Sequence, residues 1–151
     1  MKMIETLMVI DDDHVDQILY ARIAERAGVV GKLLPFFLAQ DALDYLVAGT
    51  DPQPDLILLD INMPVMDGFE FLDAATAQLG EDFCPIVIML TTSIDPRDKS
   101  RAEALAVVKD FLNKPLTEQI LRELAALTKD KTSPITAVGL KTPQDQGPTA
   151  N

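Results

Sequence analysis

The sequence predicts an α/β fold, a doubly wound (βα)5 sandwich with a central five-stranded parallel sheet. Apolar runs bounded by chain-breaking residues recur along the chain, and amphipathic segments lie between them. Strands that are apolar at every position are buried on both faces, which is typical of a parallel sheet covered by helices. Because parallel strands are joined by right-handed crossovers, five such βα units place helices on both faces of one sheet.

The predicted strands are the five apolar runs, and the first two predicted helices follow the first two runs. The runs are residues Leu7–Ile10, Leu33–Ala39, Leu56–Leu59, Ile86–Leu90 and the short Phe111–Leu112. The segment "HVDQILYARIAERAG" predicts the first helix, with Gly28 as its stop signal. Its apolar residues at helical spacing are Val15, Ile18, Leu19, Ile23 and Ala27. The segment "QDALDYLVAG" predicts a shorter helix that ends at Gly49.

The other three predicted helices follow the later strands. "FEFLDAATAQLG" gives the third, whose predicted inward residues are Phe69, Leu72 and Ala75 or Thr76. "PRDKSRAEALAVV" gives a more polar, more exposed fourth helix, with Asp95 as its cap and Pro96 in its first turn. "TEQILRELAALTKD" gives the fifth, with Thr117 as its cap. Its predicted core residues are Ile120, Leu121, Leu124 and Leu127.

Length and composition indicate one globular domain, residues 1–130, followed by a flexible tail, residues 131–151. A chain of 151 residues with 48% apolar and 25% charged residues can bury one core, and it is too short for two ordinary domains. The tail has three prolines, two glycines and no sustained hydrophobic period. The formal net charge of −11, without a basic run, argues against a nucleic-acid surface.

The single cysteine and the absence of a targeting segment predict a cytoplasmic protein. Cys84 has no partner for an internal disulfide. The N-terminus "MKMIETLMVIDDD" has an acidic residue where a signal peptide would be apolar. No apolar run approaches the length of a membrane span, so we expect no membrane partner.

Polar residues follow four of the predicted strands. In an open parallel sheet the ligand site lies beyond the carboxyl ends of the strands, so these residues are expected to meet at one rim. They are Asp11, Asp12 and Asp13 after the first strand, Asp60 after the third, Thr91 and Thr92 after the fourth, and Lys114 after the fifth.

The chemistry of this set points to phosphoryl transfer. Carboxylates gathered at one rim repel one another, which favours a bound cation among them. Hard oxygen ligands without His or Cys select a hard divalent ion, and a site with few protein ligands suits Mg²⁺. With Lys114 as a second positive charge, the set can neutralise the charge of a phosphoryl group. Asp60 is then the predicted nucleophile, which forms an aspartyl phosphate.

Four motifs in order give the chain a family resemblance. The sequence reads "VIDDD", "LLDINMPVMDG", "IMLTTS" and "FLNKPL" at the ends of the first, third, fourth and fifth predicted strands. Together they resemble the receiver domain of two-component response regulators, over roughly Thr6 to Thr128. The resemblance implies a flavodoxin-like fold and a phosphoacceptor protein. It also implies that the protein is not an enzyme, apart from slow removal of its own phosphate.

The resemblance also implies a role for each motif residue. Asp60 is the phosphoacceptor, Asp12 the direct Mg²⁺ ligand, and Asp11 acts through water. The backbone carbonyl of Asn62 is the remaining ligand. The acidic run has three members, so the metal pair is Asp11 with Asp12, as the end of the apolar strand at Ile10 favours, or else Asp12 with Asp13.

Three further residues complete the implied site and its switch. Thr91 bonds the phosphoryl oxygen, and Lys114, which precedes a cis proline, pairs with that oxygen. Phe111 changes rotamer as Thr91 is drawn toward the phosphate. Two features depart from the family pattern: Thr92 stands where Ala is more common and narrows access to the phosphate, and "AVVKD" replaces the usual Gly-Ala before the fifth strand.

The implied partners are a sensor histidine kinase or phosphotransfer protein and an unknown downstream protein. A homodimer through helix four, strand five and helix five is a further implied contact. The segments "LTTSIDPRD" and "FLNKPLT" resemble those of stand-alone receivers associated with phytochrome-like or hybrid kinases.

Two alternatives to this interpretation stay open, and a third is excluded. A degenerate receiver would act as a binding module without phosphorylation, although every expected acid, hydroxyl and lysine is present. An aspartyl-phosphate phosphohydrolase needs a second acid two residues after its nucleophile, and here that residue is Asn62, which cannot exchange a proton. A calcium-binding loop is excluded because "DDDHVDQILYAR" lacks Gly at its sixth position and Glu at its twelfth.

Overall fold

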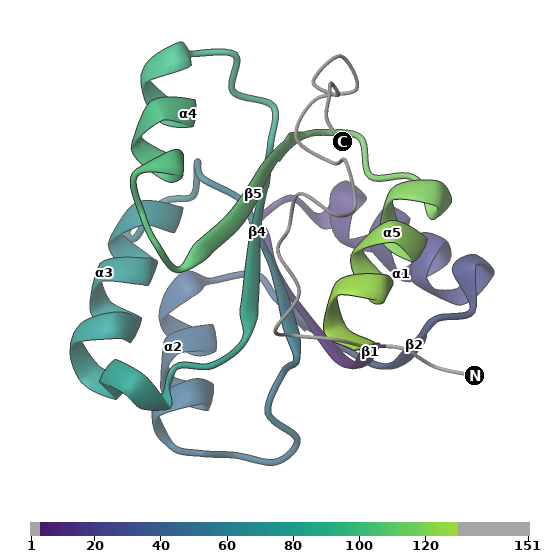
Figure 1. Cartoon of the computed structure of the whole chain (residues 1–151), viewed down its shortest axis with the longest axis horizontal. Helices are drawn as coiled ribbons and strands as arrows, with labels where there is room; N and C mark the ends of the chain where they lie inside the picture. The colour runs from purple at the N-terminus through teal and green to yellow at the C-terminus, as the bar shows by residue number, and fades with distance from the viewer. Residues whose placement is uncertain (1–3, 130–151) are drawn as a thin grey trace.

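The computed structural model describes residues 4–129 and confirms the predicted (βα)5 sandwich (Figure 1). Five parallel strands form one sheet in the order β2-β1-β3-β4-β5. The strands are β1 Ile4–Ile10, β2 Val30–Phe36, β3 Leu56–Leu59, β4 Ile86–Thr91 and β5 Val108–Asn113. The helices are α1 His14–Ala27, α2 Ala39–Val47, α3 Gly68–Leu79, a 3₁₀ helix Gly80–Asp82, α4 Pro96–Glu103 and α5 Glu118–Lys129. The predicted tail, residues 131–151, lies outside the described residues.

The helices cover the sheet in two layers and create two cores. Figure 1 shows α2, α3 and α4 on one face and α1 with α5 on the other. Alternate residues of a strand point to opposite faces. In β1, Leu7 and Val9 pack toward α1 and α5, whereas Met8 and Ile10 pack toward α2 and α3. The central strands β1, β3 and β4 are therefore buried on both faces, as their continuous apolar runs predict.

The two edge strands differ from their predicted boundaries. The second run was predicted to be a strand over Leu33–Ala39, whereas β2 is Val30–Phe36, and Ala39 begins α2. β5 extends over Val108–Asn113, beyond the predicted Phe111–Leu112. Both edge strands mix buried and exposed positions because only one side of each is paired, so an apolar run marks their limits poorly.

Helix α1 has the predicted limits but not the predicted apolar face. Its C-cap Gly28 has φ 71°, and the Gly28 N–H donates to the Ala24 carbonyl oxygen. The side chains of Val15, Ile18 and Leu19 are 66%, 54% and 43% exposed. The buried residues of the helix are Gln17, Tyr20, Ala24 and Ala27. The sequence prediction was thus wrong for most of the inward face of α1, which carries two polar side chains.

The later helices have the predicted caps and buried faces, but α4 is shorter than predicted. It ends at Glu103, so the predicted helical continuation "ALAVV" is wrong: Val108 already belongs to β5. In α3, Ala75 is buried and Thr76 is exposed, which decides between the two predicted inward positions. In α4, the Asp95 carboxylate caps the helix and Pro96 is its first residue. The Thr117 hydroxyl oxygen accepts a hydrogen bond from the Ile120 N–H at 3.1 Å, which confirms the predicted cap of α5. The buried leucines of α5 are Leu121, Leu124 and Leu127.

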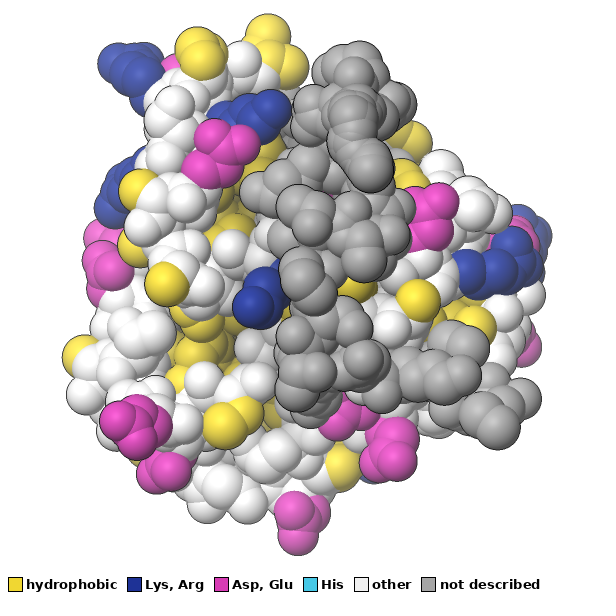
Figure 2. Space-filling view, viewed as in Figure 1, with side chains coloured by type: hydrophobic (Ala, Val, Ile, Leu, Met, Phe, Trp, Pro, Cys, Tyr) yellow, Lys and Arg dark blue, Asp and Glu magenta, His cyan; other side chains and the backbone are white. Residues whose placement is uncertain are grey.

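Charged side chains of both signs are mixed on one face of the molecule (Figure 2). On the face drawn in Figure 2, Lys and Arg side chains are scattered among Asp and Glu instead of gathering in one basic patch. A protein that neutralises a nucleic-acid backbone needs clustered Lys and Arg, so this face is unlike such a surface. Within residues 4–129, no helix is both long enough and apolar enough to span a bilayer.

Candidate functional site

The backbone of the sheet brings the predicted polar residues together at the carboxyl ends of the strands. Asp60 directly follows β3, and its N–H donates to the Ile10 carbonyl oxygen at 3.0 Å. The Lys114 N–H donates to the Thr91 carbonyl oxygen at 2.8 Å, which ties the end of β5 to the end of β4. These bonds fix the backbone positions from which the side chains reach one another.

Three aspartates form an acidic cluster at this rim. One carboxylate oxygen each from Asp11, Asp12 and Asp60 lies within 4.8 Å of the others. Asp11 and Asp60 are buried, whereas Asp12 is partly exposed. The third acid of the run serves another purpose, because Asp13 Oδ1 accepts from the N–H groups of Val15 and Asp16 and caps α1. Of the two metal pairs that the sequence allows, the geometry favours Asp11 with Asp12.

The donor set of this cluster fits Mg²⁺. The three groups are carboxylates, the hard oxygen ligands that Mg²⁺ prefers, and no His or Cys belongs to the cluster among the described residues. Asn62, the predicted carbonyl ligand, lies in the loop just after β3 and has an exposed side chain.

Lys114 places its ammonium group among the carboxylates. Its Nζ is 2.8 Å from Asp11 Oδ2, 2.7 Å from Asp16 Oδ2 and 3.7 Å from Asp60 Oδ2. Burial lowers the pKa of Lys114, but the hydrogen bonds to Asp11 and Asp16 outweigh burial and hold that pKa above its usual value. The lysine is therefore a permanent positive charge at physiological pH.

Burial makes Asp60 a weaker acid than an exposed aspartate. Its side chain retains 9% of its exposure, and burial is the largest cause that raises its pKa to about 6. The carboxylates of Asp11 and Asp12 also raise this pKa, whereas Lys114 and the Ile61 N–H lower it. One lysine does not compensate for the desolvation and the neighbouring acids, so the site attracts further positive charge.

The predicted switch residues lie on β4 and β5, the two strands whose ends the Lys114 backbone joins. Thr91 is fully buried at the end of β4, and its hydroxyl oxygen accepts from the Ser93 N–H at 3.1 Å. Phe111 is half-buried in β5 and packs against the core on the α2–α4 face. Thr92 is exposed beside Lys114, and the Lys114–Pro115 peptide is cis, as predicted.

The comparisons with known proteins agree with the geometry. A family model described as "Response regulator receiver domain" matches residues 7–126. The chain belongs to this receiver family. Among curated proteins, the receiver is 30% identical over 127 residues to the "Probable methanogenesis regulatory protein FilR2" of Methanothrix harundinacea, and the match covers 82% of the chain and 81% of the relative. Two other curated relatives are much longer, and the chain spans only 9% and 36% of them.

Solved structures of response regulators have the same fold. A "Two component response regulator from Cytophaga hutchinsonii" superposes with a TM-score of 0.77 at 30% identity, and the match covers 85% of this chain and 98% of that one. The "bacteriophytochrome response regulator AtBRR" superposes with a TM-score of 0.68 at 25% identity, covering 82% and 91%. The five-stranded parallel sheet of this receiver domain is thus the family fold.

Helix α3 approaches the backbone of Asp60 at a glycine. The Gly68 N–H donates to the Ile61 carbonyl oxygen at 2.8 Å, and a Cβ atom at Gly68 would overlap the Asp60 carbonyl oxygen. Asp67 and Glu70 form a capping box at the same helix end. The "DG" at the end of the motif "LLDINMPVMDG" therefore starts a helix and allows close packing, and it does not place a side chain in the site.

Helix α1 contributes site residues that the motifs do not contain. The Tyr20 hydroxyl donates to Asp11 Oδ2 at 2.8 Å, and Asp16 pairs with Lys114. Gln17 Nε2 donates to the carbonyl oxygens of Val9, Asp11 and Phe36, which joins the ends of β1 and β2.

The sequence prediction missed these residues of α1 because it assigned the inward face of the helix to apolar side chains. The only available signal was the spacing of Asp16 and Tyr20, which places them on one helical face.

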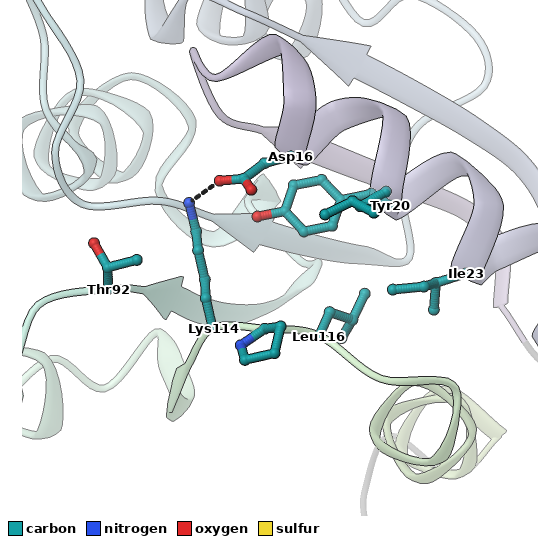
Figure 3. A pocket seen from close by; sticks show the side chains of 8 residues that line it. Asp16, Tyr20, Ile23, Thr92, Lys114 and Leu116 are labelled. Carbon is teal, nitrogen blue, oxygen red and sulfur yellow. Dashed lines mark hydrogen bonds and ion pairs between the residues drawn. The ribbon is translucent and has the colours of Figure 1, made fainter.

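A cavity of about 270 Å³ adjoins Lys114. It lies between α1 and the segment that joins β5 to α5, as Figure 3 shows. Its apolar wall includes Leu19, Ile23, Pro115 and Leu116. Lys114 lies at one end of this cavity with Thr92 beside it, so the lysine is bordered by apolar groups as well as by carboxylates.

Proposed function

We propose that the protein is a single-domain response regulator that accepts a phosphoryl group on Asp60 from the phosphohistidine of a sensor histidine kinase or a phosphotransfer protein. The observation that carries the proposal is the placement of Asp60, which is buried at the end of β3 between two other aspartates and Lys114.

The proposed reaction transfers one phosphoryl group between two side chains. An Asp60 carboxylate oxygen attacks phosphorus and forms the O–P bond as the P–N bond to the donor imidazole breaks, and the electron pair of that bond stays on the imidazole nitrogen. The transition state spreads negative charge over the phosphoryl oxygens. Lys114, 3.7 Å from Asp60, supplies fixed positive charge there, and Thr91 supplies a hydroxyl donor.

Asp11, Asp12 and Asp60 would hold Mg²⁺, together with the Asn62 carbonyl. When bound, Mg²⁺ neutralises charge on the phosphoryl oxygens. The raised pKa of Asp60 supports this assignment, because a carboxylate that burial destabilises gains more from a neighbouring cation.

The proposed output is a change of conformation followed by protein contacts. Thr91 and Phe111 lie on adjacent strands, and Met89 of β4 is the register partner of Phe111. Movement of the Thr91 hydroxyl toward a phosphoryl oxygen would alter the packing of Phe111 on β5. The surface of α4, β5 and α5 would then change for a downstream protein or a second copy of the chain. Slow loss of the phosphate is supported by Asn62, which cannot act as a general base.

The exposed apolar residues of α1 suit contact with the phosphodonor protein. Val15, Ile18 and Leu19 lie on the helix that begins at the charged rim, and they are 43–66% exposed. A donor must bring its phosphohistidine against Asp60, so it must cover the rim and the adjoining helices. Apolar side chains beside a polar site provide contact area for such a complex.

Phosphorylation by a small phosphodonor tests the proposal without a cognate kinase. After incubation with acetyl phosphate and Mg²⁺, intact-mass spectrometry should find protein with one added phosphoryl group. Asp60→Asn should prevent this addition, and a chelator of divalent ions should prevent it in the wild type. Asp73→Asn, which removes an exposed acid of α3, is the matched control and should react as the wild type does.

The same experiment separates the alternatives. An unchanged mass in the wild type would contradict phosphoacceptor function and favour a binding module. Release of inorganic phosphate from unrelated phosphomonoesters, at a rate that Asp60→Asn abolishes, would favour the phosphohydrolase.

A further inference from the structure

The ammonium group of Lys114 makes its shortest contacts away from Asp60. It is 2.7 Å from Asp16 and 2.8 Å from Asp11, whereas it is 3.7 Å from Asp60. Asp11 and Asp60 belong to the acidic cluster, but Asp16 does not. Asp16 therefore competes for the lysine without taking part in the cluster.

Asp16 is held in place by the first turn of α1. It is the third residue of the helix, and its N–H donates to the capping carboxylate of Asp13 at 3.1 Å. Its side chain is 26% exposed, and that of Lys114 is 11% exposed. Figure 3 shows the Asp16 carboxylate and the Tyr20 ring on the face of α1 that is turned toward Lys114. The backbone position of the carboxylate is thus fixed, whereas the lysine has a long flexible side chain.

The surroundings strengthen this ion pair. Lys114 and Asp16 both line the cavity whose wall includes Leu19, Ile23 and Leu116. Apolar walls reduce the solvation of nearby charges, so an ion pair beside them is stronger than one in open water. Asp11 is already satisfied in part by the Tyr20 hydroxyl and the Asp13 N–H. Asp16 is therefore the partner that most directly holds the lysine on the α1 side.

We propose that Asp16 is a positioning residue that holds Lys114 on the α1 side of the rim in the unphosphorylated protein and releases it when the phosphoryl group arrives. The inference rests on the proposed phosphorylation of Asp60. Lys114 must exchange its bond to Asp16 for one to a phosphoryl oxygen, and that exchange opposes phosphorylation. Asp16 thus sets how readily the receiver accepts its phosphate, through a contact that the four motifs do not contain.

The test is the rate of phosphorylation of Asp16→Asn by acetyl phosphate at saturating Mg²⁺. Loss of the competing carboxylate should raise the rate constant roughly two- to fivefold, the range expected for a partly exposed ion pair. Asp41→Asn is the matched control, because Asp41 is also the third residue of its helix, α2, and is exposed. That variant removes the same charge from an equivalent helix position and should react at the wild-type rate.

Removal of the lysine distinguishes positioning from a general charge effect. In a Lys114→Met background, Asp16→Asn should leave the rate unchanged, because the group that Asp16 positions is absent. Titration with beryllofluoride, a mimic of the phosphoryl group, makes the same comparison at equilibrium for variants that react slowly. Asp16→Asn should tighten beryllofluoride binding by a similar factor only where Lys114 is present.

Each other outcome has a defined meaning. An unchanged or slower rate for Asp16→Asn would overturn the inference, as would an equal acceleration with and without Lys114. A wild-type protein that gains no phosphate and binds no beryllofluoride would instead contradict the proposed function itself.

Discussion

Helices α1 and α3 both begin at the charged rim, but they use their apolar residues in opposite ways. α3 buries Phe69, Phe71 and Leu72 against the sheet, and its first glycine lies against the Asp60 backbone. α1 leaves Ile18 and Leu19 exposed and buries polar side chains instead. The difference indicates that α3 supports Asp60 through packing, whereas α1 supports the acidic cluster through hydrogen bonds and charge.

The largest expected difference between the two helices is in how much the loss of one apolar side chain lowers the free energy of unfolding. Leu72→Ala should lower the free energy of unfolding by about 2–5 kcal/mol, because Leu72 is 1% exposed and its loss leaves a cavity. Ile18→Ala should change it by less than about 0.5 kcal/mol, because Ile18 is 54% exposed. Urea denaturation of both variants measures the difference. Equal destabilisation would show that α1 is held by its apolar residues after all.

Deprotonation of Asp60 is expected to lower the stability of the folded protein. Asp60 has a pKa of about 6 in the folded protein and 3.8 as an ordinary aspartate. Between these values the folded state holds a proton that the unfolded state has lost, so stability falls as pH rises from about 4 to about 6. Without Mg²⁺, Asp60→Asn should therefore be more stable than the wild type above pH 6, by roughly 2–3 kcal/mol.

The pH dependence of the difference between these two proteins is the measurement. Denaturation in the presence of a chelator should give a gain for Asp60→Asn that is present at pH 7 and shrinks toward pH 4. Comparing the two proteins at each pH cancels the titration of the other acids. A gain of constant size would mean that the carboxylate of Asp60 is not desolvated in the folded state.

A smaller effect is expected for the buried hydroxyl of α1. Tyr20→Phe keeps the ring and removes the hydrogen bond to Asp11, which should lower the free energy of unfolding by about 1–2 kcal/mol. Tyr45→Phe is not a neutral control, because Tyr45 is partly buried and its hydroxyl donates to the Pro52 carbonyl oxygen. Ile18→Val on the same helix is a better control, since Ile18 is 54% exposed and the change removes one methylene without a polar contact. Equal stability of wild type and Tyr20→Phe would contradict a polar role for the buried face.

The sequence determined the fold class and which polar residues meet at the rim. The apolar runs of β1, β3 and β4 are continuous because both faces of these strands are covered, so their position could be read directly. The polar residues at their ends converge because parallel strands end at the same edge of the sheet. Asp60 and Lys114 were predictable for this reason, and the residues capping α4 and α5 were predictable because capping is a local interaction.

Only the tertiary structure decided which face of α1 is buried and what the lysine contacts. Both faces of that helix have helical spacing, and neighbours from other elements select the polar one, since Gln17 finds acceptors on β1 and β2. The pair between Asp16 and Lys114 joins residues 98 positions apart. Local patterns report which side chains repeat along one element, whereas contacts between elements depend on how the whole sheet and its helices pack.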